Sequence, residues 1–257
     1  MKNEANNFRK KRRQKGIYVL PNLLTTINIF CGFYSIMAAL KGDYINAAIF
    51  IIYAVVLDSL DGRIARMTNT MSKFGAEYDS LADLVSFGIA PAILVYSWSI
   101  YDFGKWGWLA SFLFVVCGAL RLARFNVQIG IIESRVFNGL PIPGAASVIA
   151  TSVMLYYYIG GEGKFQNIFL LFFTVILSLL MVSNIKYYSF KDLNFFSRKP
   201  FMSFVLIVLI LIVIVAEPQI TLFTFSMGYA VSGPLWRIWQ GIELLTHKQI
   251  KEKEAKQ

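Results

Sequence analysis

The segment from Val56 to Gly88 reads VLDSLDGRIARMTNTMSKFGAEYDSLADLVSFG and places four aspartates between two strongly apolar stretches. An unpaired carboxylate in or near hydrocarbon costs roughly 2.5–3.5 kcal/mol on insertion scales, so acids at such positions usually mark a functional site. The segment therefore predicts membrane-spanning helices on either side and a chemistry that needs several carboxylates at their ends.

The composition of the whole chain supports a membrane protein. Of its 257 residues, 56% are hydrophobic and only 16% are charged, and the mean hydropathy is +0.56. These values lie outside the range of soluble domains. The net charge of +10 comes from basic residues clustered in short loops and at both tails. That distribution favours contact with anionic membrane lipids and argues against nucleic acid as a partner.

Eight apolar segments are long enough to cross, or nearly cross, about 30 Å of hydrocarbon. They cover Leu20–Leu40, Asn46–Ile64, Phe74–Ile100, Trp106–Phe125, Ile142–Gly160, Ile168–Val182, Phe201–Ala216 and Ile220–Trp239. We expect an all-α integral membrane protein with about eight transmembrane helices. Its parts would be a basic tail (1–16), one transmembrane catalytic domain (17–240) and a polar tail (241–257).

The positions of the basic residues predict the orientation. With eight spans, alternate loops and the two tails place 22 of the 25 lysines and arginines on one side. Only Lys41, Lys105 and Lys164 fall on the other side. Because cytoplasmic loops carry the excess of Lys and Arg, both termini and the acidic segment are expected in the cytoplasm. We expect the membrane to be the plasma membrane.

The four aspartates occur as two pairs at helical spacing. Asp58 and Asp61 are three residues apart near the end of the second apolar segment, and Asp79 and Asp83 are four apart at the start of the third. Each spacing places both carboxylates on one helical face, and the short connection brings the two faces together. Converging carboxylates repel one another, so the pattern predicts a site for divalent cations, Mg²⁺ or Mn²⁺, which prefer oxygen ligands.

This segment resembles a family signature. DSLDGRIARMTNTMSKFGAEYDSLAD fits the pattern D-x2-D-G-x2-A-R-x8-G-x3-D-x3-D of the CDP-alcohol phosphatidyltransferases over 26 residues. Every fixed position is present: Asp58, Asp61, Gly62, Ala65, Arg66, Gly75, Asp79 and Asp83. The resemblance implies transfer of a phosphatidyl group from CDP-diacylglycerol to an alcohol with release of CMP. It also implies a family core of six helices, here extended by a C-terminal pair.

The resemblance further implies roles for individual residues. Asp58, Asp61 and Asp79 would bind two metal ions, and Asp83 would contribute to that site and act as the base for the acceptor hydroxyl. A second group would bind CDP-diacylglycerol: Gly62, Ala65, Arg66, Ser72, Gly75 and, from the start of the first apolar segment, Asn22 and Thr25. A glycine after Asp61 lets a ligand approach the backbone, and an arginine suits a phosphate.

A second region concerns the acceptor alcohol. ALRLARFNVQ is followed by FNGLPIPGAAS (Phe137 to Ser147), in which two prolines and two glycines predict an irregular turn into the fifth segment. Small residues then allow close helix packing. Together with the extra helical pair, these segments resemble the membrane-type branch of the family that uses serine. The resemblance implies L-serine as the second substrate and a homodimer.

Serine is a zwitterion, so its site needs a cation for the carboxylate and acceptors for the ammonium group. Arg121 and Arg124 lie three residues apart on one helical face and can supply the cation, and Arg135 is a further candidate. Asn126 and Asn138 are candidates for the ammonium group. Arginines at a helix end also commonly extend to lipid headgroups without binding a substrate.

Alternatives remain open at this point. The metal motif does not choose the acceptor, so glycerol 3-phosphate or an inositol phosphate would fit the same chemistry, although each needs a dense basic pocket. A cation transporter or channel would also use acids in a membrane, but it does not need the Gly62–Ala65–Arg66 spacing. A catalytically silent scaffold is disfavoured because all eight fixed positions are kept.

Overall fold

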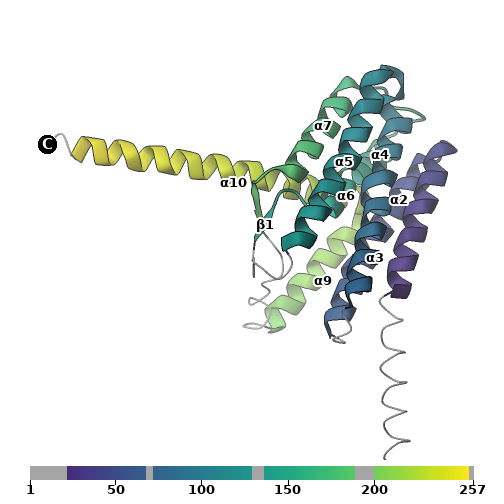
Figure 1. Cartoon of the computed structure of the whole chain (residues 1–257), viewed down its shortest axis with the longest axis horizontal. Helices are drawn as coiled ribbons and strands as arrows, with labels where there is room; N and C mark the ends of the chain where they lie inside the picture. The colour runs from purple at the N-terminus through teal and green to yellow at the C-terminus, as the bar shows by residue number, and fades with distance from the viewer. Residues whose placement is uncertain (1–21, 68–71, 129–135, 189–199, 255–257) are drawn as a thin grey trace, which may run out of the picture.

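The computed structural model describes residues 22–67, 72–128, 136–188 and 200–254. All eight apolar segments are helical there, and their arrangement is shown in Figure 1. The helices are the first helix (Asn22–Leu40), α2 (Tyr44–Met67), α3 (Lys73–Asp83), η1 (Leu84–Ile89), α4 (Ala90–Val95), η2 (Tyr96–Ile100), η3 (Tyr101–Phe103), α5 (Lys105–Gln128), α6 (Ile142–Tyr158), α7 (Ile168–Val182), α9 (Pro200–Ala216) and α10 (Pro218–Glu254). Two short strands, β1 (Val136–Asn138) and β2 (Lys186–Tyr188), pair antiparallel.

The prediction of an all-α membrane protein is confirmed. Four helices are long and apolar enough to cross a membrane within the described ranges: Asn22–Leu40, Tyr44–Ile64, Lys73–Phe103 and Lys105–Val127. α7 is a shorter apolar helix of 15 residues. The total of eight crossings stays a prediction.

The third span is continuous but not a regular α-helix. It runs for 31 residues from α3 to η3 and contains two wider π-helical turns. In the first of these, the Ala90 N–H donates to the Val85 carbonyl, five residues back. Pro91 follows directly; it has no N–H, and its ring would clash with a carbonyl four residues earlier. The wide turn accommodates this proline and lies immediately after Asp83.

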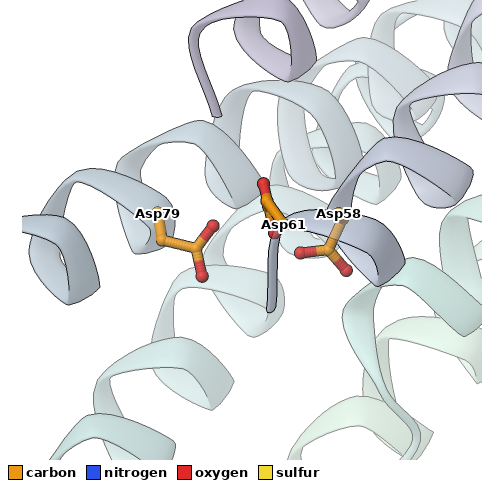
Figure 2. A group of neighbouring side chains, drawn as sticks. All are labelled: Asp58, Asp61 and Asp79. Atoms are coloured by element: carbon orange, nitrogen blue, oxygen red, sulfur yellow. The ribbon is translucent and has the colours of Figure 1, made fainter. Parts of the chain in front are cut away.

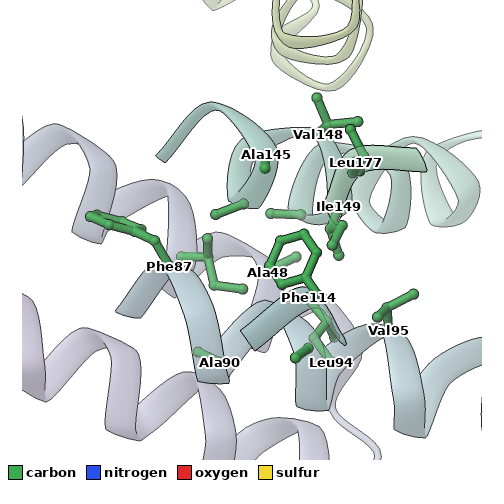
Figure 3. Packing of buried hydrophobic residues seen from close by; sticks show 14 of the residues in the cluster. Ala48, Phe87, Ala90, Leu94, Val95, Phe114, Ala145, Val148, Ile149 and Leu177 are labelled. Carbon is green, nitrogen blue, oxygen red and sulfur yellow. The ribbon is translucent and has the colours of Figure 1, made fainter. Parts of the chain in front are cut away.

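The core is built where the third span crosses α5, α6 and α7. Phe87, Leu94 and Phe114 are fully buried among small and branched residues of the neighbouring helices (Figure 3). On α2 the buried face is mostly alanine, at positions 47, 48 and 54, and this face packs against α6. Small side chains bring these backbones close together, as is usual in membrane bundles.

The turn into α6 depends on one glycine. The Gly139 N–H donates to the Ile185 carbonyl at 2.8 Å, and Gly139 has a φ of +80°. A Cβ at this position would lie 2.3 Å from the Met181 carbonyl oxygen. Only glycine combines this backbone conformation with so close an approach. The irregular turn predicted for FNGLPIPGAAS is confirmed.

The last helix is longer than predicted. We expected a span over Ile220–Trp239 followed by a polar tail, whereas α10 continues to Glu254 and extends away from the bundle (Figure 1). Good helix formers after residue 241 explain the continuation. Pro234 lies inside the helix and leaves the Ala230 carbonyl without its usual partner four residues on. The Tyr187 hydroxyl donates to that carbonyl at 2.9 Å, which ties β2 to α10.

Candidate functional site

The two aspartate pairs meet where α2 ends and α3 begins. Asp58 and Asp61 lie on the last turns of α2, and Asp79 faces them from α3 (Figure 2). One carboxylate oxygen from each of these three residues lies within 4.8 Å of the other two. Asp61 is buried, with 3% of its surface exposed, and the other two are half-buried. The expected convergence of the two helix faces is therefore present.

Asp83 joins the same cluster from one turn further along α3. Its carboxylate interacts electrostatically with Asp58, Asp79 and Asp61 and also with the guanidinium of Arg121 on α5. The Oδ1 atoms of Asp79 and Asp83 are buried and have no hydrogen-bond partner among the described residues. Buried carboxylate oxygens without partners are costly, and one arginine does not balance four acids.

These residues fit a divalent metal ion. The donor set is all carboxylate oxygen, which hard cations such as Mg²⁺ and Mn²⁺ prefer. A cation would relieve the repulsion within the cluster and provide a partner for the unpaired Asp79 and Asp83 oxygens. The structure thus supports a metal-binding cluster of acids, while the identity and number of the ions stay predictions.

Residues from the first helix border the acid cluster. The Thr25 hydroxyl donates to Asp61 Oδ2 at 3.4 Å. Ser72 caps α3, because its Oγ accepts the Gly75 N–H at 2.9 Å. A Cβ at Gly75 would lie 3.1 Å from Ser72 Oγ and 3.4 Å from Asn22 Oδ1, so these three residues are neighbours.

Three further residues that are predicted to bind the nucleotide follow Asp61 on α2. Gly62 follows Asp61 and is half-buried. Ala65 and Arg66 belong to the last turn of the helix, but their side chains lie outside the described part of the chain. Thr25 therefore contacts the acid cluster, and Asn22, Ser72 and Gly75 lie together at the start of α3.

The residues predicted for serine separate into different environments. Arg121 is buried, with 9% of its surface exposed, and it is the one that interacts with Asp83. Arg124 is engaged elsewhere: it donates to the Val182 carbonyl at 3.0 Å and to Asn184 Oδ1 at 3.3 Å. These hydrogen bonds link α5 to the end of α7 and the residues that follow it.

The predicted asparagines are also apart from one another. Asn126 Nδ2 donates to Ser80 Oγ at 2.9 Å and so links α5 to α3. Asn138 is exposed in β1, opposite Lys186. Arg135 lies outside the described residues. Among the four candidates that the structure describes, Arg121 is the one that interacts with the acids.

Sequence reasoning missed Asn28. This residue is fully buried in the first helix, one turn beyond Thr25, and neither polar atom of its side chain has a hydrogen-bond partner within the described structure. Its carbonyl accepts the Ser86 hydroxyl at 2.9 Å, which joins the first helix to the third span. The available signal was a polar amide inside an apolar segment, because polar side chains within membrane helices are costly and commonly functional.

Comparison with known proteins agrees with this geometry. The model of the CDP-alcohol phosphatidyltransferase family matches residues 18–183. That match includes the acid cluster and all eight signature positions. The chain belongs to this family. Its two last helices, α9 and α10, follow the matched region of the phosphatidyltransferase fold.

Several curated relatives are similar over most of their length. A CDP-diacylglycerol–serine O-phosphatidyltransferase of Helicobacter pylori is 39% identical over 235 residues, which cover 90% of this chain and 96% of the relative. One of Bacillus subtilis is 37% identical over 172 residues, covering 67% and 91%. An archaetidylserine synthase of Methanothermobacter thermautotrophicus is 41% identical over 170 residues, covering 65% and 69%.

Proposed function

We propose that this phosphatidyltransferase transfers the phosphatidyl group of CDP-diacylglycerol to the hydroxyl of L-serine, giving phosphatidylserine and CMP. The observation that carries the proposal is the convergence of Asp58, Asp61 and Asp79, with Asp83 beside a buried arginine. Family membership supports the donor and the leaving group. Relatives named for serine or archaetidylserine chemistry support the acceptor.

The acids would hold the cofactor, and the neighbouring residues would bind the nucleotide. Asp58, Asp61, Asp79 and Asp83 would bind Mg²⁺ or Mn²⁺, which we propose as a pair. When bound, such ions neutralise charge on a diphosphate during its displacement. Asn22, Ser72 and Gly75 lie together at the start of α3 and are proposed to bind CDP-diacylglycerol with Thr25, Gly62, Ala65 and Arg66.

Asp83 is proposed as the general base. The serine hydroxyl oxygen attacks the phosphatidyl phosphorus and forms the new P–O bond, while the bond to the CMP oxygen breaks in line. Asp83 takes the hydroxyl proton at its carboxylate. Because a carboxylate is a weak base for an alcohol, proton transfer is expected late, alongside bond formation. Most of the rate enhancement would come from positioning and charge stabilisation.

Arg121 is proposed to bind the serine carboxylate. It is buried next to Asp83, so a carboxylate held there would present the serine hydroxyl close to the base. Guanidinium groups bind carboxylates with two parallel hydrogen bonds. Arg124, whose N–H groups already contact Val182 and Asn184, is a weaker candidate. Arg135 stays proposed as a further cation for the serine carboxylate, and Asn126 and Asn138 stay proposed as partners of its ammonium group.

The function is tested with purified protein, CDP-diacylglycerol, Mn²⁺ or Mg²⁺ and labelled serine. We expect equal amounts of phosphatidylserine and CMP and loss of both after chelation of the metal. Parallel reactions contain glycerol 3-phosphate or an inositol phosphate in place of serine. If CMP were released with one of these alcohols and not with serine, the protein would still be a phosphatidyltransferase, but its acceptor would be that alcohol. Metal flux into vesicles without any nucleotide dependence would instead indicate a cation transporter or channel.

Location and assembly complete the proposal. The apolar helices and the family indicate a membrane protein, and the excess of basic residues on one side favours an orientation with both termini and the site in the cytoplasm. We propose that the membrane is the plasma membrane. We also propose a homodimer. Reporter tags at the two ends, tested for accessibility in sealed vesicles, and the mass of the purified protein by light scattering check these points.

A further inference from the structure

Asn28 lies next to the acid cluster, one turn deeper in the bundle. On the first helix it follows Thr25 by three residues, and the Thr25 hydroxyl donates to Asp61 Oδ2 at 3.4 Å. On the third span, the Ser86 hydroxyl donates to the Asn28 carbonyl at 2.9 Å, and Ser86 follows Asp83 by three residues. Residues three apart share a helical face and lie roughly 4.5 Å apart along the axis. Asn28 is therefore about one turn from the cluster along either helix.

The crossing of these two helices fixes the position of Asn28. One turn beyond it, a Cβ at Gly32 would lie only 2.7 Å from Ser86 Cα, so the two backbones are in direct contact there. Side chains on a helix lean toward its N-terminus. Because the first helix begins at the acid end of the bundle, the Asn28 amide extends toward the level of Thr25 and the acids.

The amide of Asn28 has no partner in the described part of the chain. The residue has no exposed surface, and neither its Nδ2 nor its Oδ1 has a hydrogen-bond partner there. An asparagine amide offers two N–H donors and an oxygen that accepts. Leaving both kinds of group unpaired inside a bundle is destabilising, so a residue of this kind indicates a ligand or another functional reason.

Unpaired groups concentrate at the acid cluster. Within the described ranges, eight buried side-chain polar atoms lack a partner, and five of them belong to Asn28, Asp79, Asp83 and Arg121. A bound cation and a substrate carboxylate would serve the aspartates and Arg121. The Asn28 oxygen still needs a donor. The diphosphate and ester groups of a lipid donor offer only acceptors, whereas the ammonium group of an amino-acid acceptor offers N–H donors.

We propose that Asn28 determines specificity for the acceptor: its Oδ1 accepts a hydrogen bond from the ammonium group of L-serine while the serine hydroxyl lies at Asp83. This inference rests on the proposed function and gives the ammonium group a partner one turn from the proposed base. Asn28 differs in this respect from Asn126, whose amide already donates to the Ser80 hydroxyl.

The test compares Asn28→Leu with the wild type in steady-state assays with serine and CDP-diacylglycerol varied separately. Leucine keeps the size of the side chain and removes both polar groups. We expect the KM for serine to rise about ten- to a hundredfold, the range for loss of a hydrogen bond to a charged group. The KM for CDP-diacylglycerol should stay within about twofold, because that substrate does not use the amide. An unchanged serine KM, or equal rises in both KM values, overturns the inference.

Acceptor analogues show which group of serine Asn28 contacts. Ethanolamine keeps the ammonium group, whereas 3-hydroxypropanoate keeps the carboxylate and lacks the ammonium group. In Asn28→Leu, kcat/KM should fall by similar factors for serine and ethanolamine and should stay within about twofold for 3-hydroxypropanoate. A uniform loss with all three alcohols would exclude a contact between Asn28 and the ammonium group.

The thermal midpoint separates a ligand-binding role from a structural one. Because the amide has no partner within the described structure, an apolar side chain of the same size should leave the midpoint unchanged or raise it. Ser35→Ala is the matched control: Ser35 is equally buried on the same helix, two turns further on, and its hydroxyl donates to the Ala47 carbonyl at 2.8 Å. This control should lower the midpoint and leave both KM values unchanged. A similar drop in Asn28→Leu would show that the amide is bonded within the protein and would overturn the inference.

Two further results keep the possible roles apart. Mn²⁺ binding, followed by electron paramagnetic resonance, should be the same in Asn28→Leu and the wild type, and weaker binding would make Asn28 part of the metal site instead. If Asn28→Leu does not fold, Asn28→Ala replaces it in every assay, with the same expected KM values. A wild type that makes no phosphatidylserine contradicts the proposed function itself. A wild type that makes it, beside an Asn28→Leu variant with an unchanged serine KM, contradicts only the role of Asn28.

Discussion

Single aspartates carry most of the chemistry expected of this chain. Asp61 is the most buried of the three clustered acids, and it also accepts a hydrogen bond from Thr25 of the first helix. A carboxylate in this position is costly without a cation, and its neighbours on α2 and α3 increase that cost. The local sequence therefore reflects ligand binding more than stability of the apo protein.

Asp61→Asn tests the metal site. The change removes one negative charge from the cluster while keeping the size of the side chain, so we expect weaker Mn²⁺ binding and at least about a hundredfold lower rate of CMP release. Mn²⁺ titration followed by electron paramagnetic resonance measures the binding independently of activity.

Asp43→Asn is the control for that variant. Asp43 lies at the other end of α2, where it accepts hydrogen bonds from the backbone and side chain of Asn46. Asparagine also caps helices well, so this variant should bind Mn²⁺ and release CMP like the wild type. Equal losses in both variants would point to a general effect of charge on α2 and not to a metal site.

Asp83→Asn tests the proposed base. An amide cannot take the proton of the acceptor hydroxyl, so turnover should fall by about 10²- to 10⁴-fold. Binding of CDP-diacylglycerol, measured by calorimetry in detergent, should change much less than turnover. Full CMP release by this variant would remove Asp83 from the role of base.

At the scale of elements, the site depends on how closely the first helix approaches the third span. A Cβ at Gly32 would lie 2.4 Å from Ser86 Oγ and 2.7 Å from Ser86 Cα. The same crossing holds Asn28, through the hydrogen bond from Ser86, and lies one to two turns from Thr25. Packing deep in the span thus sets the position of residues at the site.

Gly32→Ala should separate these helices. Because the clash involves backbone as well as side chain, we expect a loss of about 1–3 kcal/mol in stability, measured as a lower thermal midpoint in detergent. Gly228→Ala on α10 is the matched change, since a Cβ there meets nothing within 4 Å. It should be neutral or stabilise by up to about 1 kcal/mol. Equal midpoints for the two variants would contradict the close crossing.

Much of this organisation could be predicted from the sequence. Helical spacing placed Asp58, Asp61, Asp79 and Asp83 in one cluster, because a spacing of three or four residues fixes the face of a helix whatever lies around it. The difference between Arg121 and Arg124 could not be predicted. Both lie on one face of α5, and only the packing of α7 shows that Arg124 is bound to Val182.

Other features depend on contacts between distant segments. The hydroxyls of Thr151 and Ser226 lie 2.9 Å apart although the two residues are 75 positions apart in the sequence, and no local pattern links them. Hydropathy predicts a span that ends at Trp239, whereas α10 continues through the polar residues to Glu254. Polar residues with high helix propensity extend the helix there, and hydropathy does not measure helix propensity.

At the scale of the whole molecule, α10 joins two regions with different roles. Up to about residue 233 it packs against α6 and β2, and beyond Pro234 it leaves the bundle (Figure 1). Leu235, Ile238 and Trp239 are well exposed there. We therefore expect catalysis to be independent of the final turns of this helix.

A chain ending after Gln240 tests this division. Since residues 241–254 extend beyond the bundle, the shortened protein should release CMP at a rate within about twofold of the full chain. A second, shorter chain that ends before Ser226 loses the contact between Ser226 and Thr151 and should lose activity. Loss of turnover in the first protein alone would show that the final turns serve the reaction.

The wide turn at Leu84–Ile89 has a consequence for the angular phase of the third span. An α-helix advances about 100° per residue, so one extra residue in a turn rotates everything before it relative to everything after it. On this span, Asp79 and Asp83 precede the turn, and the core residues Leu94 and Val95 follow it. Deleting a single residue there would leave the core residues packed but rotate the Asp79 and Asp83 side chains by about a quarter of a turn away from Asp58 and Asp61. The length of this turn therefore fixes the direction in which both carboxylates point.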